Sequence, residues 1–182
     1  MSKTLIKLVD ASIYPASLLV VSKTIGILFF NNFLGLNWGI EHTLKQFNIF
    51  SVELLYLDRA SMLLSTSYSN LFMMVLMILG FIIKIIQIRY LHESRISPNT
   101  VYKLNDFNLL HLIKTSFDIY IEGVIWLIFC IIAWLIILTS SLLGISYVEI
   151  TFVSLIVILI CVTFFLREIS ILIEQSKKNL KL

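Results

Sequence analysis

Four stretches of this chain are apolar over a length that would cross a lipid bilayer. They run from about 13 to 34, 60 to 83, 123 to 143 and 148 to 166. A transmembrane helix needs about 20 predominantly apolar residues, so each stretch is a candidate span. Only 14% of the residues are charged, whereas a soluble domain carries about 25%. The sequence therefore predicts an all-α, polytopic integral membrane protein with four transmembrane helices.

The four spans and their connections use most of the chain, so residues 1–182 are predicted to form a single transmembrane domain. The last two spans are separated only by residues 144–147, which predicts an antiparallel hairpin. Pro15 stands near the start of the first span, where its missing N–H is tolerated. We therefore expect Pro15 in the first turn of that helix.

Basic residues predict the orientation of the spans. They gather in three segments that four spans would place on one side of the membrane: Lys3 and Lys7 in the N-terminal tail, Arg89, Arg95, Lys103 and Lys114 in the connection 84–122, and Arg167, Lys177, Lys178 and Lys181 in the tail 167–182. The loop 35–59 on the other side holds only Lys45 and Arg59. Because Lys and Arg accumulate in cytoplasmic segments, both termini are expected on the cytoplasmic or equivalent side, in a bacterial plasma membrane or an organelle inner membrane. The net charge of +3 is too small and too scattered to indicate a nucleic-acid partner.

Both long connections carry amphipathic patterns. In the loop 35–59, apolar residues recur at helical spacing at Phe47, Phe50, Leu54 and Leu57. The connection 84–122 is interrupted at Ser97-Pro98-Asn99, where one helix is predicted to stop and another to begin. After this break, residues 106–122 have one apolar and one polar side. Amphipathic helices of this kind lie in the membrane interface, so we expect one interfacial helix on each side.

Lys23 is the only charged residue between positions 11 and 40. In the span 13–34 its Cα would lie about 15 Å deep, near the bilayer midplane. Exposing a lysine to lipid at that depth costs at least about 2.5–3.5 kcal/mol, so Lys23 should face a helix, an aqueous cavity or a partner. Ser22, Asn31 and Asn32 extend this predicted intramembrane polar site. The alternative is a span shifted to 24–40, with Lys23 at its boundary.

No acidic residue is predicted at the depth of Lys23. Glu122 and Glu149 are the candidate charged partners, although each lies about half a bilayer away along its helix. This absence favours a partner chain, an anionic lipid or an anionic substrate as the neighbour of Lys23. Basic residues near the ends of the spans are expected to contact anionic lipid headgroups: Lys84, Arg89, Arg95, Lys177 and Lys178.

The sequence gives little support to an enzyme. It contains no phosphate-binding glycine loop, no nucleophile elbow and no paired-carboxylate site. The three histidines are dispersed, and Cys130 and Cys161 lie inside apolar runs, where buried, unpaired thiols are expected. We therefore predict no catalytic residue, no metal site and no cofactor.

The favoured function is a small non-catalytic subunit or scaffold that packs against membrane lipids and partner chains, or against further copies of itself. The polar side of the first span is expected to make that contact. The alternative is a small channel or transporter, in which Lys23, Asn31 and Asn32 line a path for an anion or a proton. A lipid-modifying enzyme would have to use His111, Asp118 and Glu122, and it is the least favoured hypothesis.

Overall fold

The computed structural model describes residues 3–42, 52–90, 96–107 and 116–179. In chain order the elements are α1 (Lys3–Phe33), β1 (Trp38–His42), β2 (Val52–Tyr56), α2 (Arg59–Tyr90), α3 (Pro98–Asp106), α4 (Ser116–Leu142) and α5 (Val148–Asn179). Four of these helices, α1, α2, α4 and α5, are long and apolar enough to cross a membrane. The predicted number of spanning helices is confirmed.

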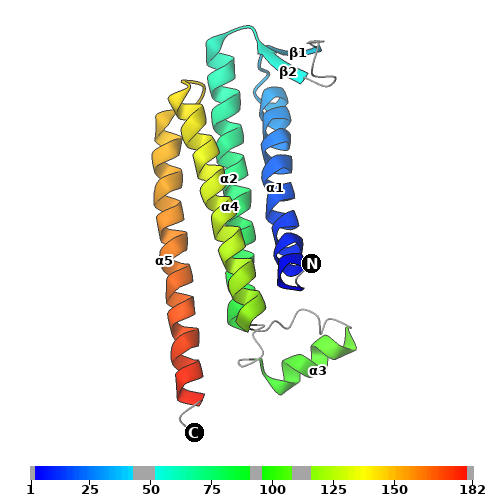
Figure 1. Cartoon of the computed structure of the whole chain (residues 1–182). Helices are drawn as coiled ribbons and strands as arrows, with labels where there is room; N and C mark the ends of the chain where they lie inside the picture. The colour runs from blue at the N-terminus through cyan, green and yellow to red at the C-terminus, as the bar shows by residue number, and fades with distance from the viewer. Residues whose placement is uncertain (1–2, 43–51, 91–95, 108–115, 180–182) are drawn as a thin grey trace.

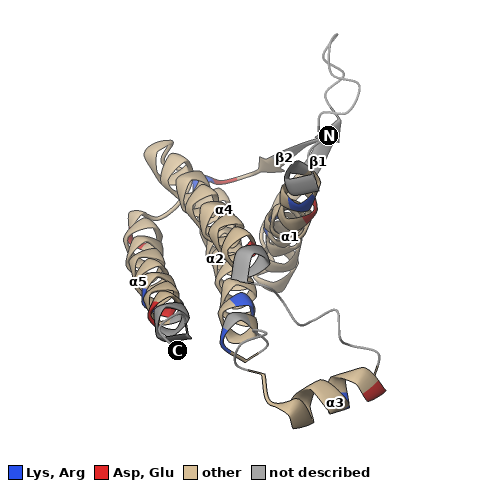
Figure 2. Ribbon diagram, turned by 60° about the horizontal axis from the view of Figure 1, so that its bottom comes forward, with Lys and Arg blue, Asp and Glu red and all other residues tan. Residues whose placement is uncertain are grey.

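The four long helices form an elongated bundle (Figure 1). α2 and α4 each pack against both α1 and α5. Residues 143–147 join α4 to α5, and this linker lies at the same end of the bundle as the paired strands β1 and β2 (Figure 1). We call this the linker end. Both termini lie toward the opposite end, which we call the terminal end. Figure 2 shows that charged residues concentrate toward the ends of the helices, leaving their middle parts largely uncharged.

The apolar core lies between α2, α4 and α5. Its buried members are Met73, Met74, Met77, Phe81, Trp126, Cys130, Ala133, Ile137, Ile158, Cys161 and Phe165. At the centre of this contact Gly80 leaves room for the indole of Trp126, because a Cβ at Gly80 would lie only 2.2 Å from the indole Cζ3. The approach of α2 to α4 therefore depends on a glycine.

The linker end is shaped by specific caps. Gly144 has a φ of 69°, and its N–H donates to the carbonyl of Ser141 while the N–H of Ile145 donates to that of Ser140, both at 3.0 Å. This Schellman arrangement ends α4 and needs the left-handed conformation that glycine adopts without a Cβ penalty. At the start of α2, a carboxylate oxygen of Asp58 accepts the N–H of Ser61 at 2.9 Å.

The loop between α1 and α2 differs from the prediction. The described residues form an antiparallel β-hairpin in which Trp38 pairs with Tyr56 and Ile40 with Leu54, so the predicted surface helix is wrong over 52–56. The other residues of the predicted apolar stripe, Phe47 and Phe50, lie outside the described residues. Pairing between strands is a contact between residues far apart in the sequence. The helical spacing of Leu54 and Leu57 does not reveal it.

The connection between α2 and α4 matches the prediction in part. α2 continues to Tyr90, and a new helix begins at Pro98, where the Ser97 hydroxyl accepts the N–H of Thr100. The predicted break and the helix start that follows it are thus confirmed, but the end of this helix at Asp106 was not predicted. Of the predicted amphipathic helix 106–122, residues 108–115 lie outside the described residues and 116–122 form the first turns of α4. Pro15 lies inside α1 and not in its first turn, because this helix already begins at Lys3.

Candidate intramembrane polar site

α1 runs without interruption through Lys23 and ends at Phe33. A span shifted to 24–40 would keep only residues 24–33 in this helix, which is a rise of about 15 Å and half of the hydrocarbon thickness. The chain then turns at residues 34–37 and enters β1. The shifted span therefore does not fit the structure, and Lys23 lies within the candidate span Ile6–Phe33.

The ammonium group of Lys23 donates a hydrogen bond to the side-chain oxygen of Asn70 on α2. Asn70 is fully buried, and its Nδ2 donates to the hydroxyl of Ser146 in the linker at 3.1 Å. The hydroxyl of Ser67 lies 3.3 Å from that of Ser146 and accepts the N–H of Tyr147 at 2.9 Å. One chain of hydrogen bonds thus joins α1, α2 and the linker. We call Lys23, Asn70, Ser67 and Ser146 the Lys23 network.

Asn31 takes part in a second group of hydrogen bonds, nearer the end of α1. Its Nδ2 lies 3.2 Å from the hydroxyl of Tyr56 on β2. The same hydroxyl lies 2.7 Å from the Ser65 hydroxyl on α2. Asn31 and Ser65 are both 0% exposed. The phenol of Tyr56 therefore ties the β-hairpin to α1 and α2 at one point.

Close backbone approach accompanies the polar contact between α1 and α2. Ser69 donates from its hydroxyl to the backbone carbonyl of Lys23 at 2.9 Å. One turn along α1, a Cβ on Gly26 would lie 3.1 Å from the Ser69 hydroxyl oxygen. Ser22 is buried, and its hydroxyl bonds the carbonyl of Leu19 in its own helix at 3.1 Å. Ser22 and Asn31 are thus buried within the chain, and Lys23 is partly buried with its ammonium group bonded to α2.

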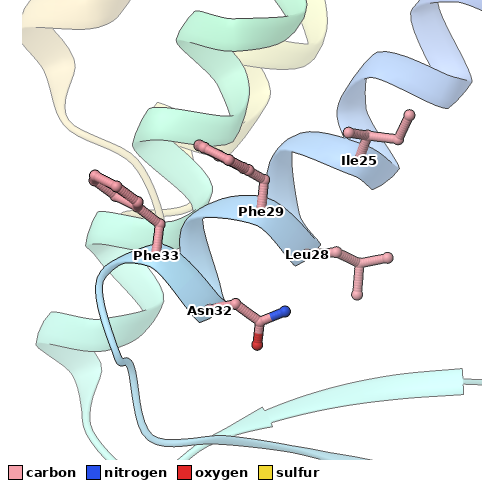
Figure 3. A pocket seen from close by; sticks show the side chains of 5 residues that line it. All are labelled: Ile25, Leu28, Phe29, Asn32 and Phe33. Carbon is pink, nitrogen blue, oxygen red and sulfur yellow. The ribbon is translucent and has the colours of Figure 1, made fainter.

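Asn32 does not join these residues. It is exposed on α1 and lines an open hollow of about 430 Å³ together with Ile25, Leu28, Phe29 and Phe33 (Figure 3). The rings of Phe29 and Phe33 stack there with centroids 5.5 Å apart. The predicted polar site is therefore divided, with Ser22, Lys23 and Asn31 inside the chain and Asn32 outside it.

The two candidate acidic partners lie elsewhere. Glu122 forms an ion pair of 3.0 Å with Lys84, near the terminal end of α2 and α4. Glu149 is exposed at the start of α5, at the linker end. Neither is brought to Lys23 as an ion-pair partner by the described contacts.

Four of the five predicted lipid-contacting cations lie in described helices, toward the terminal end. Lys84 is only partly exposed and also donates to the side-chain oxygen of Gln87 at 3.1 Å. Arg89 is exposed on the last turn of α2. Arg95 lies outside the described residues, and Lys177 and Lys178 belong to the last turns of α5, where the structure describes only the backbone.

Cys130 and Cys161 are unpaired and buried, as predicted. The thiol of Cys130 faces the backbone carbonyl of Met77 at 3.8 Å. Within the described ranges, no three His, Cys, Asp or Glu side chains are grouped so that they could hold a metal ion.

Sequence reasoning missed the residues that receive Lys23. The second span contains no charged residue, but residues 61–70 contain six Ser, Thr and Asn side chains: Ser61, Ser65, Thr66, Ser67, Ser69 and Asn70. Ser61, Ser65 and Ser69 recur every fourth residue and all three are buried. Such a polar stripe indicates that the helix contacts another helix in the membrane. This pattern could have identified the side of α2 that receives Lys23.

No family model, no curated protein and no solved structure matches this chain. Its function must therefore be argued from its own geometry.

Proposed function

We propose that the chain is a small non-catalytic subunit or scaffold of a membrane complex. In this proposal α4 and α5 cross the membrane as a hairpin and both termini lie on the cytoplasmic or equivalent side. The carrying observation is that Lys23, Asn31 and Asn70 are hydrogen-bonded to other groups of the same chain. Buried polar groups that satisfy one another specify and hold a packing arrangement, which is a structural role.

The surface offered to a partner is the apolar side of α1, formed by Ile25, Leu28, Phe29 and Phe33. We propose this side in place of the polar side, because Ser22 and Asn31 are already buried within the chain. In its most apolar stretch α1 has 17% of its residues buried, against 33% for α2 and for α4. α1 is therefore the spanning helix that the rest of the chain covers least.

Asn32 defines the chemistry of that partner. Its amide is exposed beside the stacked rings of Phe29 and Phe33. An amide without a hydrogen-bond partner is unfavourable in a hydrocarbon environment, whereas polar side chains on neighbouring membrane helices bond one another. The fitting partner is a transmembrane helix that brings an apolar ridge to the hollow and a polar side chain to Asn32.

Cross-linking in native membranes tests this proposal. In a background with Cys130→Ala and Cys161→Ala, a single cysteine replaces Phe29 on α1 or, as a matched control, Val153 on α5. Both side chains are more than half exposed, at 53% and 57%. After labelling with a maleimide-benzophenone, whose ketone inserts into neighbouring C–H bonds on irradiation, the Phe29→Cys variant should give one adduct of defined mass and the Val153→Cys variant none. Equal adducts from both positions, or none from Phe29→Cys, would contradict the proposal.

A channel or transporter is the second candidate, and the Lys23 network favours it. The hydrogen bonds from Lys23 through Asn70 reach Ser146 in the linker, so polar groups lead from the interior of the bundle toward its end. Proton and chloride flux into reconstituted vesicles tests this function. Flux that falls in the Lys23→Met variant would replace the subunit proposal, and the same leak in both proteins would remove the channel.

A further inference from the structure

α3 makes few contacts with the rest of the described chain. None of its residues is buried, and it packs extensively against no other described helix or strand. It has only nine residues, whereas a helix shorter than about 12–15 residues is marginally stable in water unless its apolar side is packed. The Ser97 cap and Pro98 favour its start, but they do not cover a side of the helix. A further surface is therefore needed to stabilise α3.

The two sides of α3 differ in polarity. Val101, Leu104 and Phe107 follow one another at intervals of three residues, which places them on one side of the helix. Phe107 is the C-cap and is 74% exposed. The other side holds three exposed polar residues: Asn99, Lys103 and Asp106. The polar side is thus suited to water, and the apolar side is the one that needs a covering surface.

The place of α3 in the chain indicates which surface this is. α3 lies between two candidate membrane spans, Arg59–Gln87 in α2 and Tyr120–Leu142 in α4. Figure 1 and Figure 2 show it at the terminal end, running across the direction of the long helices. A helix tied at both ends to spans on one side of a membrane stays close to that membrane surface. Its crosswise direction is that of an amphipathic helix lying in the plane of the interface.

We propose that α3 binds the surface of the lipid bilayer at the terminal end, with Val101, Leu104 and Phe107 inserted at the boundary between headgroups and acyl chains. The contact is apolar in origin, because the only charged residues of the helix, Lys103 and Asp106, carry opposite charges. Zwitterionic lipid is therefore sufficient. The interfacial helix of this connection is then residues 98–107 and not 106–122, whether or not α1 has a partner.

Spin labels on the full chain test this contact. In a background with Cys130→Ala and Cys161→Ala, a labelled cysteine replaces Leu104 or, as the matched control, its neighbour Lys103. The protein is reconstituted in phosphatidylcholine vesicles, and power saturation measures access of oxygen, which concentrates in lipid, and of a water-soluble nickel chelate. Oxygen should reach the Leu104 label and the chelate the Lys103 label, with a depth difference of about 10 Å, the diameter of a helix with its side chains. Ile156→Cys on α5, a position 58% exposed, is the reference for a lipid-facing site.

Other locations of α3 give other patterns. Equal access of the chelate to the Leu104 and Lys103 labels would show that the helix lies in water and would overturn the proposal. A Leu104 label that neither reagent reaches would show that protein covers the apolar side, and it would overturn the proposal as well. Added phosphatidylglycerol should leave both depths unchanged. Insertion that requires this anionic lipid would overturn the apolar origin of the contact.

A charge on the apolar side tests what holds the helix at the lipid. With the label at Leu104, Val101→Glu should move the label toward the chelate, because a carboxylate is costly to bury in lipid. Asn99→Glu is the matched control, since it places the same charge on the polar side and should leave the depth unchanged. The same depth in both variants would overturn the insertion of Val101.

Discussion

α1 and α4 both pack against α2, but through contacts of different kinds. The α1 contact contains hydrogen bonds from Lys23 and Ser69. The α4 contact is apolar along most of its length, where the Trp126 indole fits against Gly80, and has an ion pair toward the terminal end. In lipid an apolar surface gains little by exchanging acyl chains for another helix, so close fit and hydrogen bonds decide which helices associate. The comparison teaches that α4 is placed by shape and α1 by a few polar atoms.

The largest effect is expected where shape decides. Gly80→Ala puts a methyl group 2.2 Å from the Trp126 ring, and forcing the two helices apart should cost about 3 kcal/mol, the upper part of the range for overpacked cores. Denaturant unfolding in bicelles measures this loss. Gly39→Ala is the control, because nothing lies within 4 Å of a Cβ at that position. Similar losses of unfolding free energy in both variants would show that the space which Gly80 leaves for Trp126 has no special role.

The next largest effect is expected at the polar contact between α1 and α2. Asn70→Leu removes the acceptor of Lys23 and the donor to Ser146, and it should cost about 2 kcal/mol because hydrogen bonds to charged groups contribute about 1.5–3 kcal/mol. Asn32→Leu serves as the comparison, since it replaces an asparagine that is exposed on α1. Its unfolding free energy in bicelles should change by less than about 0.5 kcal/mol. If Asn32→Leu lowers the unfolding free energy as much as Asn70→Leu does, burial does not explain the role of Asn70.

The linker should show a smaller effect. Gly144→Ala forces a Cβ into a conformation with a φ of 69°, and the left-handed region costs a non-glycine residue about 1–2 kcal/mol. Gly144→Asn should lose less, because asparagine tolerates this region. The melting temperatures of the two variants give the ranking. An alanine variant as stable as wild type would mean that the linker does not need the left-handed turn.

The ion pair between Lys84 and Glu122 should contribute less still. Its side chains are 25% and 19% exposed, and partly exposed pairs typically contribute about 0.2–1 kcal/mol. A double-mutant cycle with Lys84→Met and Glu122→Gln should give a coupling in that range that shrinks when salt is added. Coupling that is unaffected by salt would place the pair in a better shielded environment than the structure does.

The smallest expected effect concerns pH at the start of α2. The hydroxyl and N–H of Ser61 hydrogen-bond the Asp58 carboxylate and hold its pKa below its usual value of 3.8. Since the folded pKa is the lower one, the stabilisation is complete above the unfolded value and is lost as the pH falls through the folded value. The melting temperature of wild type should therefore drop slightly below about pH 4 relative to Asp58→Asn. If the melting temperatures of the two proteins depend on pH in the same way, the Asp58 carboxylate does not stabilise the start of α2.

Much of the fold could be predicted, because spans are read from local composition. Four apolar stretches gave four helices, and the residues Ser97 and Pro98 marked a helix start that the structure contains. The β-hairpin could not be read in this way, since Trp38 and Tyr56 are paired across the loop and no local pattern joins them.

Only the α1 part of the candidate site could be predicted from the sequence. Lys23 stood out because a charge in an apolar stretch is rare, whereas its acceptor Asn70 is neutral and escaped a search for charged partners. Ser146 was hidden for another reason. It lies in a linker, and its contact with Asn70 depends on how far α2 extends past the end of α4. Depth along neighbouring helices is a property of packing, and the sequence of one helix does not contain it.

The central claim is that Lys23 is held inside the chain by Asn70. A double-mutant cycle between Lys23→Met and Asn70→Leu, measured as unfolding free energy in bicelles, tests it most directly. The account predicts a coupling of about 1.5 kcal/mol or more, the contribution of a hydrogen bond with one charged partner, so that the double variant is more stable than the sum of the two losses implies. Strictly additive losses would show that the two side chains do not interact and would contradict the account.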